Sequence, residues 1–281
     1  MKRRTLLRHA AVILPAAAFL PRASAQFGLP PAPPSTARAC IVLDAIGGQI
    51  LYERNADERR AVASTQKLMS ALVCVESTPL DKIAVVSSYD ASAEPHKMYL
   101  KAGERYPLKT LLQAMLIESF NDAARCVAQT CAGSEAAFGV WMTRRAQQLG
   151  MKNSQFRNAS GLPAEAQYST ARDMSRVARA VLYNSTLRSM VGRHEVNITR
   201  PDGRVKKCNT TNHLLRPNSP FYLPQCIGMK TGFTNLAGKC LVSAANYRGR
   251  TIICVMLGSS MKSGTIWKES SALLNWGLGI R

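Results

Sequence analysis

Two residues in the segment Ala63-Ser64-Thr65-Gln66-Lys67 could do chemistry together, because Ser64 offers a hydroxyl nucleophile and Lys67 a base. Residues three apart share one helix face, so a helix from 64 to about 76 would point both groups the same way. A serine hydroxyl is a poor nucleophile at neutral pH and needs a base within hydrogen-bond reach. The pair therefore indicates covalent acyl transfer. The alternative is a solvated helix face, since a chain this rich in Ser and Lys shows such a spacing about once by chance.

Two further motifs follow in the chain, Ser119-Phe120-Asn121 and Lys230-Thr231-Gly232. Their order and separations are those of the three-motif serine acyl-transferases, the penicillin-binding proteins and class A β-lactamases. Taken alone, Ser119 or Asn121 would equally well be a helix N-cap. Three ordered motifs are far rarer by accident than one, so acyl transfer is the favoured interpretation.

The start of the chain predicts export. Residues 1–25 combine an apolar stretch at 10–20 and the small-residue cleavage site Ala23-Ser24-Ala25 with a basic head, typical of a signal peptide. Arg3-Arg4 also resembles a twin-arginine signal, so the export route stays open. Residues 26–37 form a Pro-rich lead-in, and residues 38–281 are predicted to be one catalytic domain. No later run reaches the ~18 apolar residues of a membrane span, so we expect a periplasmic protein.

The formal net charge of the chain is +20, and the first 25 residues hold five positive charges and no acid, leaving +15 for the mature part. Its Lys and Arg residues are scattered, aromatic residues are few and no nucleic-acid motif is present, so nucleic acid is not the expected partner. A basic exported protein more plausibly meets an anionic polymer such as peptidoglycan. Weak contact with an anionic membrane surface stays open.

All eight cysteines lie beyond the signal peptide. Their even number permits disulfides without fixing the pairing, and Cys208 with Cys226, which flank one loop, is the best single candidate. No Cys-x-x-Cys or His-x-x-x-His spacing occurs, so neither a metal nor another cofactor is predicted.

Apolar runs separated by turn residues predict strands at both ends of the chain, and helical periodicity dominates the middle. Strands are expected within 38–60 and 226–281, and a helical lobe spans about 64–190 with a hairpin after it. A helix at 265–274 would cover the sheet. This order favours an α+β fold in which an antiparallel sheet from both chain ends carries a helical insertion.

Over residues 38–277 the sequence resembles the serine D-alanyl-D-alanine carboxypeptidases, the low-molecular-mass penicillin-binding proteins. Beyond the three motifs, the similar stretches include Phe156-Arg157-Asn158, Gly161-Leu162-Pro163 and Gly228-Met229-Lys230. The resemblance implies a β-lactamase/DD-peptidase-like fold, a five-stranded antiparallel sheet covered by terminal helices plus a helical lobe. It also implies removal of the terminal D-Ala from peptidoglycan pentapeptides, a part in peptidoglycan biosynthesis and cell shape, and acylation by β-lactam antibiotics.

The resemblance assigns a role to each motif residue. Ser64 would be the acylated nucleophile, Lys67 its general base and Ser119 a proton relay, while Asn121 would hold a substrate amide. Lys230 and Thr231 would meet the terminal carboxylate, and Gly232 would leave room for the substrate along its strand. The backbone N–H groups of Ser64 and Phe233 would form the oxyanion hole.

Two departures from the family pattern stand out. Several members carry an arginine where this chain has Thr210-Thr211-Asn212; Arg216 could replace it, although an exposed surface arginine is the more frequent outcome. Phe120 stands in place of a small residue, which would narrow the cleft or alter substrate preference.

Other functions would fit part of this pattern. A class A β-lactamase needs a Glu-x-x-Leu-Asn loop, which is absent, and no Gly-x-Ser-x-Gly elbow adjoins His96, His194 or His213 to support a Ser-His-Asp hydrolase. A peptidoglycan DD-endopeptidase uses the same motifs and stays an alternative. A non-catalytic cell-wall binding protein that keeps the fold is the alternative from a different class.

Overall fold

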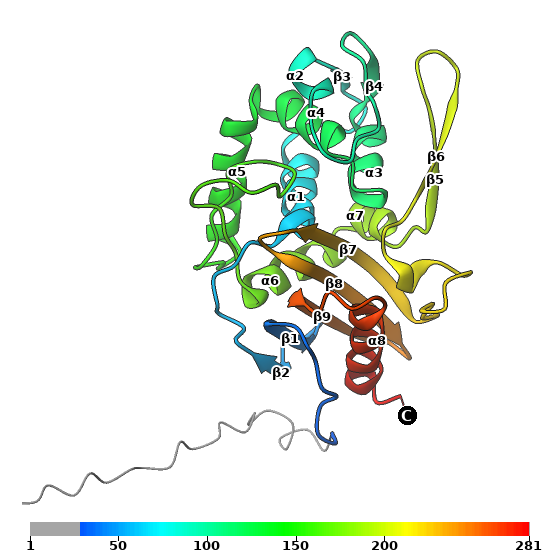
Figure 1. The fold of residues 1–281 in the computed structure, drawn as a ribbon. Coiled ribbons are helices and arrows are strands. Elements are labelled where there is room, and N and C mark those ends of the chain that lie inside the picture. The colour runs from blue at the N-terminus through cyan, green and yellow to red at the C-terminus, as the bar shows by residue number, and fades with distance from the viewer. Residues whose placement is uncertain (1–28, 281) are drawn as a thin grey trace, which may run out of the picture.

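The central sheet is built from both ends of the chain (Figure 1). The computed structural model describes residues 29–280, and its five-stranded sheet has the order β2-β1-β9-β8-β7 with antiparallel neighbours. Its strands are β1 (Ala39–Asp44), β2 (Ile50–Arg54), β7 (Cys226–Thr234), β8 (Gly238–Tyr247) and β9 (Arg250–Ser259). The predicted five-stranded antiparallel sheet is confirmed, and β7 lies at one edge of it.

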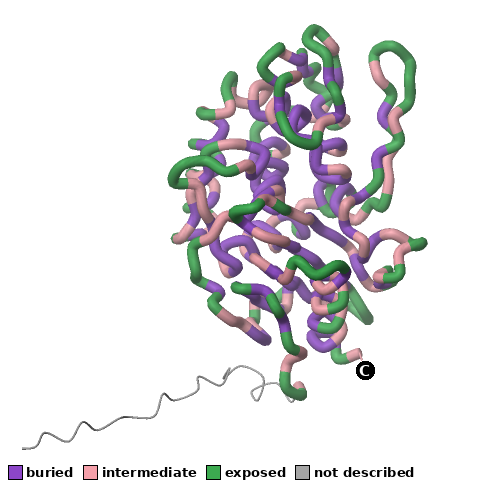
Figure 2. Tube along the Cα trace, in the orientation of Figure 1, coloured by how far each residue is buried: buried purple, intermediate pink, exposed green. Residues whose placement is uncertain are grey.

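Apolar layers cover both faces of the sheet, which explains why its central strands are apolar throughout instead of alternating with polar residues. Along β1, Ala39 and Ile41 face the helical lobe, whereas Cys40 and Val42 face the helix α8 (Thr265–Leu278). Figure 2 shows the resulting buried interior, with exposed residues concentrated in the connecting loops.

The helical lobe packs on one face of the sheet. A 3-10 turn and seven helices form it: η2 (Ala63–Gln66), α1 (Lys67–Ser77), α2 (Ser88–Ala91), α3 (Leu108–Ile117), α4 (Asn121–Ala132), α5 (Glu135–Gln148), α6 (Ala171–Tyr183) and α7 (Ser185–Val191). Helix α6 has an N-terminal cap, because the Thr170 side chain accepts a hydrogen bond from the Asp173 backbone N–H. Pro79 follows the end of α1, as expected of a residue that cannot continue a helix.

Three smaller elements complete the chain. Strands β3 (Ile83–Val85) and β4 (Arg105–Pro107) pair beside the helical lobe, and β5 (Glu195–Thr199) with β6 (Val205–Asn209) forms a projecting hairpin (Figure 1). A 3-10 turn, η3 (His213–Leu215), then leads back toward the sheet.

The structure corrects the expected start of the first helix. Ser64 lies in η2, and the α-helix begins only at Lys67. Ala63 has a positive φ of 49°, so the chain enters through a tight turn instead of a regular helical one. The three-residue spacing still puts Ser64 and Lys67 side by side, because 3-10 side chains at i and i+3 are eclipsed.

The predicted Cys208–Cys226 disulfide is not formed. Both residues are buried free thiols. The Cys208 thiol lies 3.8 Å from the Lys206 carbonyl oxygen, whereas the Cys226 thiol donates to Gly228 O at 3.1 Å. The two sulfurs therefore have separate surroundings.

The predicted signal peptide lies outside the described residues. Residues 29–37 run without helix or strand along the sheet, and Pro30 O accepts a hydrogen bond from Trp276 Nε1 in α8 at 2.8 Å. Of the helices described between residues 29 and 280, none has both the length and the apolarity needed to cross a membrane.

Candidate active site

The side chain of Lys67 lies at the centre of a buried polar cluster. Its Nζ is 2.9 Å from Ser64 Oγ, 2.7 Å from Asn121 Oδ1 and 2.8 Å from the carbonyl oxygen of Ser160. These contacts join the start of α1, the start of α4 and the loop before α6. The structure thus brings two of the predicted site residues, Ser64 and Asn121, within hydrogen-bond distance of a third, Lys67.

Burial changes the acidity of two lysines in this region. The Lys67 side chain is fully buried, and desolvation followed by the nearby positive charge of Lys230 lowers its pKa well below the usual value. The carboxylates of Glu135 and Asp122 oppose this shift. Lys230 is 1% exposed, and desolvation lowers its pKa to about 7. Lys67 can therefore serve as a neutral amine base near neutral pH.

The low pKa of Lys230 should make stability depend on pH. Between about pH 7 and pH 8.5 the unfolded chain keeps a proton that folded Lys230 has lost, so the free energy of unfolding rises with pH. The rise amounts to at most about 1.4 kcal/mol per pH unit from this group. Urea unfolding of the wild type and of Lys230→Met at both pH values tests this: the wild type should show the steeper rise. Equal slopes would contradict a depressed Lys230 pKa.

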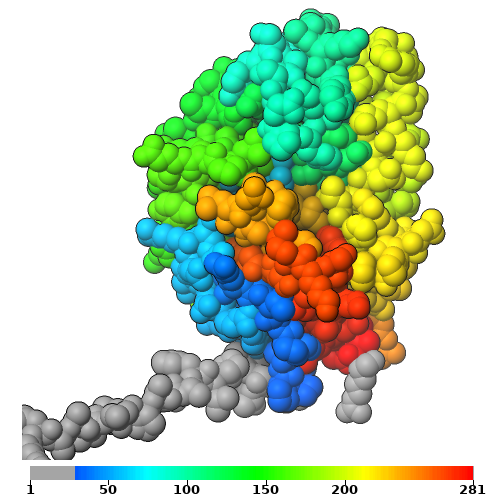
Figure 3. All heavy atoms as spheres, in the orientation of Figure 1, coloured from blue at the N-terminus to red at the C-terminus, as the bar shows by residue number. Residues whose placement is uncertain are grey.

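An open cleft of about 420 Å³ lies directly above this cluster, between the helical lobe and β7. Figure 3 shows the face on which the two parts of the fold meet. The predicted residues that line the cleft are Ser64, Ser119, Asn121, Thr231, Gly232 and Phe233. The two lysines lie beneath its surface. Within residues 29–280, no group of three or more His, Cys, Asp or Glu side chains is placed to hold a metal ion.

Strand β7 forms the lower wall of the cleft and approaches Ser64 closely. A Cβ atom on Gly232 would lie 2.8 Å from the Ser64 backbone nitrogen, so only glycine allows the strand to pass this near. The hydroxyl groups of Thr231 and Thr211 are 2.5 Å apart. Lys230 Nζ donates to the Thr231 carbonyl oxygen at 3.1 Å. Phe233 is 52% exposed at the mouth.

The upper wall begins at the junction between α3 and α4, where the second motif lies. Ser119 has a φ of +74°, a left-handed conformation rare for serine, and it is 7% exposed. Such local strain is common at functional sites. Asn121 opens α4, and its Nδ2 donates to the carbonyl oxygen of Pro95.

The loop 158–162 is part of the site, although the sequence assigned it no role. Ser160 O accepts from Lys67, and Leu162 lines the cleft. The loop is held by Asn158, whose backbone carbonyl accepts from Gln66 Nε2 and whose side chain accepts from the Gly161 N–H at 2.8 Å. The stretches 156–158 and 161–163 belong to the family resemblance, and this was the signal that could have located the loop.

Gly161 allows the loop 158–162 to approach the backbone of Ala63 and Ser64 closely. Its φ is +85°, and an added Cβ would lie 2.1 Å from the carbonyl oxygen of Ala63. We expect Gly161→Ala to push Ser160 O away from Lys67 and slow acylation of Ser64 about 10- to 100-fold. Stopped-flow kinetics with a chromogenic β-lactam measures this rate.

Gly203→Ala is the matched control for Gly161→Ala. Gly203 has a similar φ of +82° in the hairpin turn, but nothing lies within 4 Å of an added Cβ. It therefore carries the same backbone strain without the clash. Acylation of Gly161→Ala as fast as that of Gly203→Ala would contradict the role of the close approach.

Comparison with known proteins assigns the chain to a family. A family model described as peptidase S11, D-alanyl-D-alanine carboxypeptidase, matches residues 29–261. The chain belongs to this family. The predicted family resemblance is therefore confirmed.

Individual members of the S11 family are similar to this chain over most of its length. The Bacillus subtilis D-alanyl-D-alanine carboxypeptidase DacF is 32% identical over 229 residues, which cover 80% of this chain and 58% of that protein. A Pseudomonas aeruginosa D-alanyl-D-alanine endopeptidase is 31% identical, with 89% of this chain and 79% of that protein covered. The crystal structure of a Mycobacterium tuberculosis D-alanyl-D-alanine carboxypeptidase has a TM-score of 0.84 at 29% identity, covering 91% and 96%.

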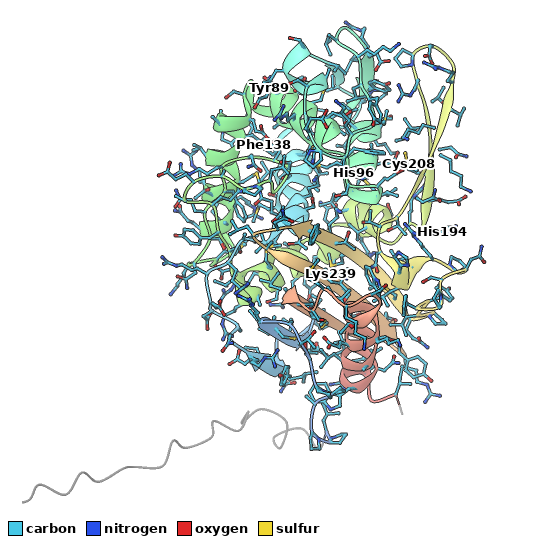
Figure 4. The ribbon with its side chains drawn as sticks, in the orientation of Figure 1. Tyr89, His96, Phe138, His194, Cys208 and Lys239 are labelled. Atoms are coloured by element: carbon cyan, nitrogen blue, oxygen red, sulfur yellow. The ribbon has the colours of Figure 1, made fainter. Side chains whose placement is uncertain are left out.

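Phe120, the second departure from the family pattern, is a core residue. It is 2% exposed and is not among the residues that line the cleft, so it does not narrow the cleft directly. Its ring stacks on that of His96 at 5.2 Å, and His96 does line the cleft. Figure 4 labels His96 on the helical-lobe side and Lys239, another lining residue, on the sheet side.

Arg216, the candidate replacement for the arginine missing at 210–212, is not the exposed surface residue that was expected. It is half-buried, and its Nε donates to the Thr210 carbonyl oxygen at 2.6 Å. It lines a smaller hollow that shares His96 and Thr211 with the cleft. A guanidinium group thus lies close to the Thr211–Thr231 end of the site.

Proposed function

We propose that this chain is an exported serine D-alanyl-D-alanine carboxypeptidase that removes the terminal D-Ala from peptidoglycan stem peptides. The observation that carries the proposal is the 2.9 Å contact between Ser64 Oγ and buried Lys67 Nζ, under a cleft walled by β7. Membership of the S11 family supports the same reaction. The basic head, apolar stretch and cleavage site within residues 1–25 support export to the periplasm.

Acylation begins with attack of Ser64 Oγ on the carbonyl carbon of the penultimate D-Ala. Neutral Lys67 can donate its two N–H groups to Asn121 Oδ1 and Ser160 O, which leaves the lone pair on Nζ free to take the Ser64 proton. The backbone N–H groups of Ser64 and Phe233 would stabilise the oxyanion.

The leaving group departs when the C–N bond of the tetrahedral intermediate breaks. Ser119 lines the cleft and would pass the proton to the amine of the released D-Ala. An ester between Ser64 and the shortened peptide remains. Water then hydrolyses this ester and restores the free hydroxyl.

Binding of the terminal carboxylate is assigned to the middle of β7. Lys230 supplies a buried cationic group when protonated, and Thr231 supplies a hydroxyl paired with Thr211. Asn121 would hold a substrate amide, but its Nδ2 already donates to Pro95 O. A substrate carbonyl must therefore replace that contact.

β-Lactam antibiotics would acylate Ser64 by the same route. The chain lacks the Glu-x-x-Leu-Asn loop that activates a deacylating water in class A β-lactamases. We therefore expect the penicilloyl ester to persist long enough for detection by intact mass.

The experiment that tests the function has two parts. Brief incubation with benzylpenicillin should add one penicilloyl group to each chain, measured by intact mass. Incubation with a pentapeptide ending in D-Ala-D-Ala should release one D-Ala, measured by liquid chromatography. Absence of both on folded protein would favour a non-catalytic cell-wall binding protein and overturn the proposal.

A DD-endopeptidase remains the second candidate, because the Pseudomonas aeruginosa relative carries that name. Digestion of purified cross-linked muropeptides separates the two activities. Release of monomers from cross-links faster than release of D-Ala from pentapeptides would assign the chain to the endopeptidases instead.

A further inference from the structure

A second hollow, of about 460 Å³, lies on the other side of Phe233 from the cleft. It is bounded by the turn between β7 and β8, by the end of β9 and by the side chains of Arg38 and Arg60. The β7–β8 turn lies on the molecular face drawn in Figure 3, below the helical lobe. Phe233 lines both hollows and is half-exposed, so an extended ligand can pass over its ring from one to the other.

Among the described residues, two buried polar atoms of the side chains that line this second hollow have no hydrogen-bond partner. The Arg60 side chain is 11% exposed, and its Nη1 bonds Glu58 Oε1 at 2.5 Å, but its buried Nε has no acceptor. Ser259 is 5% exposed, and its buried Oγ also has no hydrogen-bond partner. Buried polar groups are nearly always paired in native proteins, so unpaired ones call for an explanation.

The charge of the hollow favours an anion. Arg38 and Arg60 line it, and the lining contains no acidic side chain. Glu58, which pairs with Arg60, neutralises one of the two positive charges and is itself 43% exposed. Guanidinium groups bind carboxylates through pairs of N–H donors, and the exposed side chain of Arg38 can offer such a pair to a ligand in the hollow.

The direction of β7 connects this hollow with the proposed reaction. Along the strand, Lys230 and Thr231 come first, Gly232 lies beside Ser64, and Phe233 leads to the turn. A peptide laid along β7 with its terminal carboxylate at Thr231 places the residues before the scissile bond beyond Phe233. Each residue of an extended chain advances about 3.3 Å, so one or two residues before the scissile bond are enough to reach past Phe233.

We propose that the second hollow is an anion subsite that binds a carboxylate carried by the acyl part of the peptide substrate. Arg38 and Arg60 are then specificity-determining residues. This inference rests on the proposed function and adds to it the chemical class of the substrate: a peptide with a free carboxyl group within a few residues before D-Ala-D-Ala.

Matched peptides test the subsite. Two pentapeptides differ only at the residue before D-Ala-D-Ala, which is diaminopimelate with its side-chain carboxyl either free or amidated. A second pair differs in the same way at the α-carboxyl of the preceding γ-linked D-Glu. For one of the two pairs we expect the wild-type kcat/KM to be about tenfold higher for the peptide with the free carboxyl than for the amidated peptide, mainly because its KM is lower. High salt should remove this preference.

The variants Arg38→Gln and Arg60→Gln should each bring that ratio close to one. Arg59→Gln is the matched control: Arg59 contacts Asn153 and is not among the lining residues, so its ratio should equal that of the wild type. If Arg60→Gln does not fold, exposed Arg38 still provides the test. Penicilloyl adduct formation by each variant reports whether the Ser64 site is intact.

The outcomes separate the two proposals. A preference that appears in either peptide pair and is lost in the arginine variants supports the subsite and identifies which carboxyl it binds. D-Ala release at equal kcat/KM from the free and amidated peptides overturns the subsite and leaves the carboxypeptidase function standing. Absence of D-Ala release and of the penicilloyl adduct overturns both.

Discussion

Replacement of Ser64 by alanine is expected to abolish the penicilloyl adduct and to lower D-Ala release at least about 10⁴-fold. The change removes one oxygen atom that is 2.9 Å from Lys67 Nζ, and no covalent intermediate can form without it. Lys67 and the cleft stay in place, so peptide binding should persist. Intact mass after benzylpenicillin and chromatography of released D-Ala measure the two losses.

Ser77→Ala provides the control for this variant. Ser77 is an exposed serine at the other end of α1, so the same chemical change there leaves the cleft untouched. It should form the adduct at the wild-type rate. A full adduct on Ser64→Ala would show that another residue is acylated and would overturn the assignment of the nucleophile.

Lys67→Met is expected to slow acylation about 10³-fold, equivalent to about 4 kcal/mol in the barrier. Methionine has a similar length but no basic nitrogen, so the Ser64 proton has no acceptor. The change also leaves Asn121 Oδ1 and Ser160 O without their donor, so we expect a loss of stability of about 1–3 kcal/mol for each of these buried acceptors. Rapid-mixing kinetics of β-lactam acylation measures the rate, and thermal unfolding verifies the fold.

Lys67→Arg sharpens the same test. Arginine keeps a positive charge and hydrogen-bond donors but is not deprotonated in proteins, so it cannot act as a base. We expect it to be as slow as Lys67→Met if the proton-accepting role is correct. Lys109→Met, on the exposed face of α3, is the matched control and should acylate normally. Near-normal acylation by Lys67→Arg would show that charge alone is required.

The sequence predicted the sheet and the contact between Ser64 and Lys67 well, because both depend on local patterns. Apolar runs bounded by turn residues marked the strands, and a three-residue spacing alone brings Ser64 and Lys67 together. The strand order was not predicted, since it depends on β9 lying between β1 and β8, which local periodicity does not encode.

The residues missed in the site act through backbone or distant contacts. Ser160 contributes its carbonyl oxygen, a group that every residue has, so no side-chain pattern identifies it. Phe120 was expected at the cleft because it stands inside a motif. The left-handed φ of Ser119 instead precedes a turn that buries the ring against His96. Conformations of this kind depend on tertiary packing, which spacing rules do not capture.

Strand β7 has a neighbour, β8, on one side only. An open strand edge offers unpaired N–H and C=O groups to any extended chain, including a second copy of the same protein, and therefore carries a risk of aggregation. Here the 3-10 turn η2 packs over Gly232 and the helical lobe forms the opposite wall of the cleft. Under the proposed function, only a narrow, extended peptide could join the sheet there as a temporary sixth strand. The same covering that brings Ser64 beside β7 would thus also hinder polymerisation of the protein through this edge.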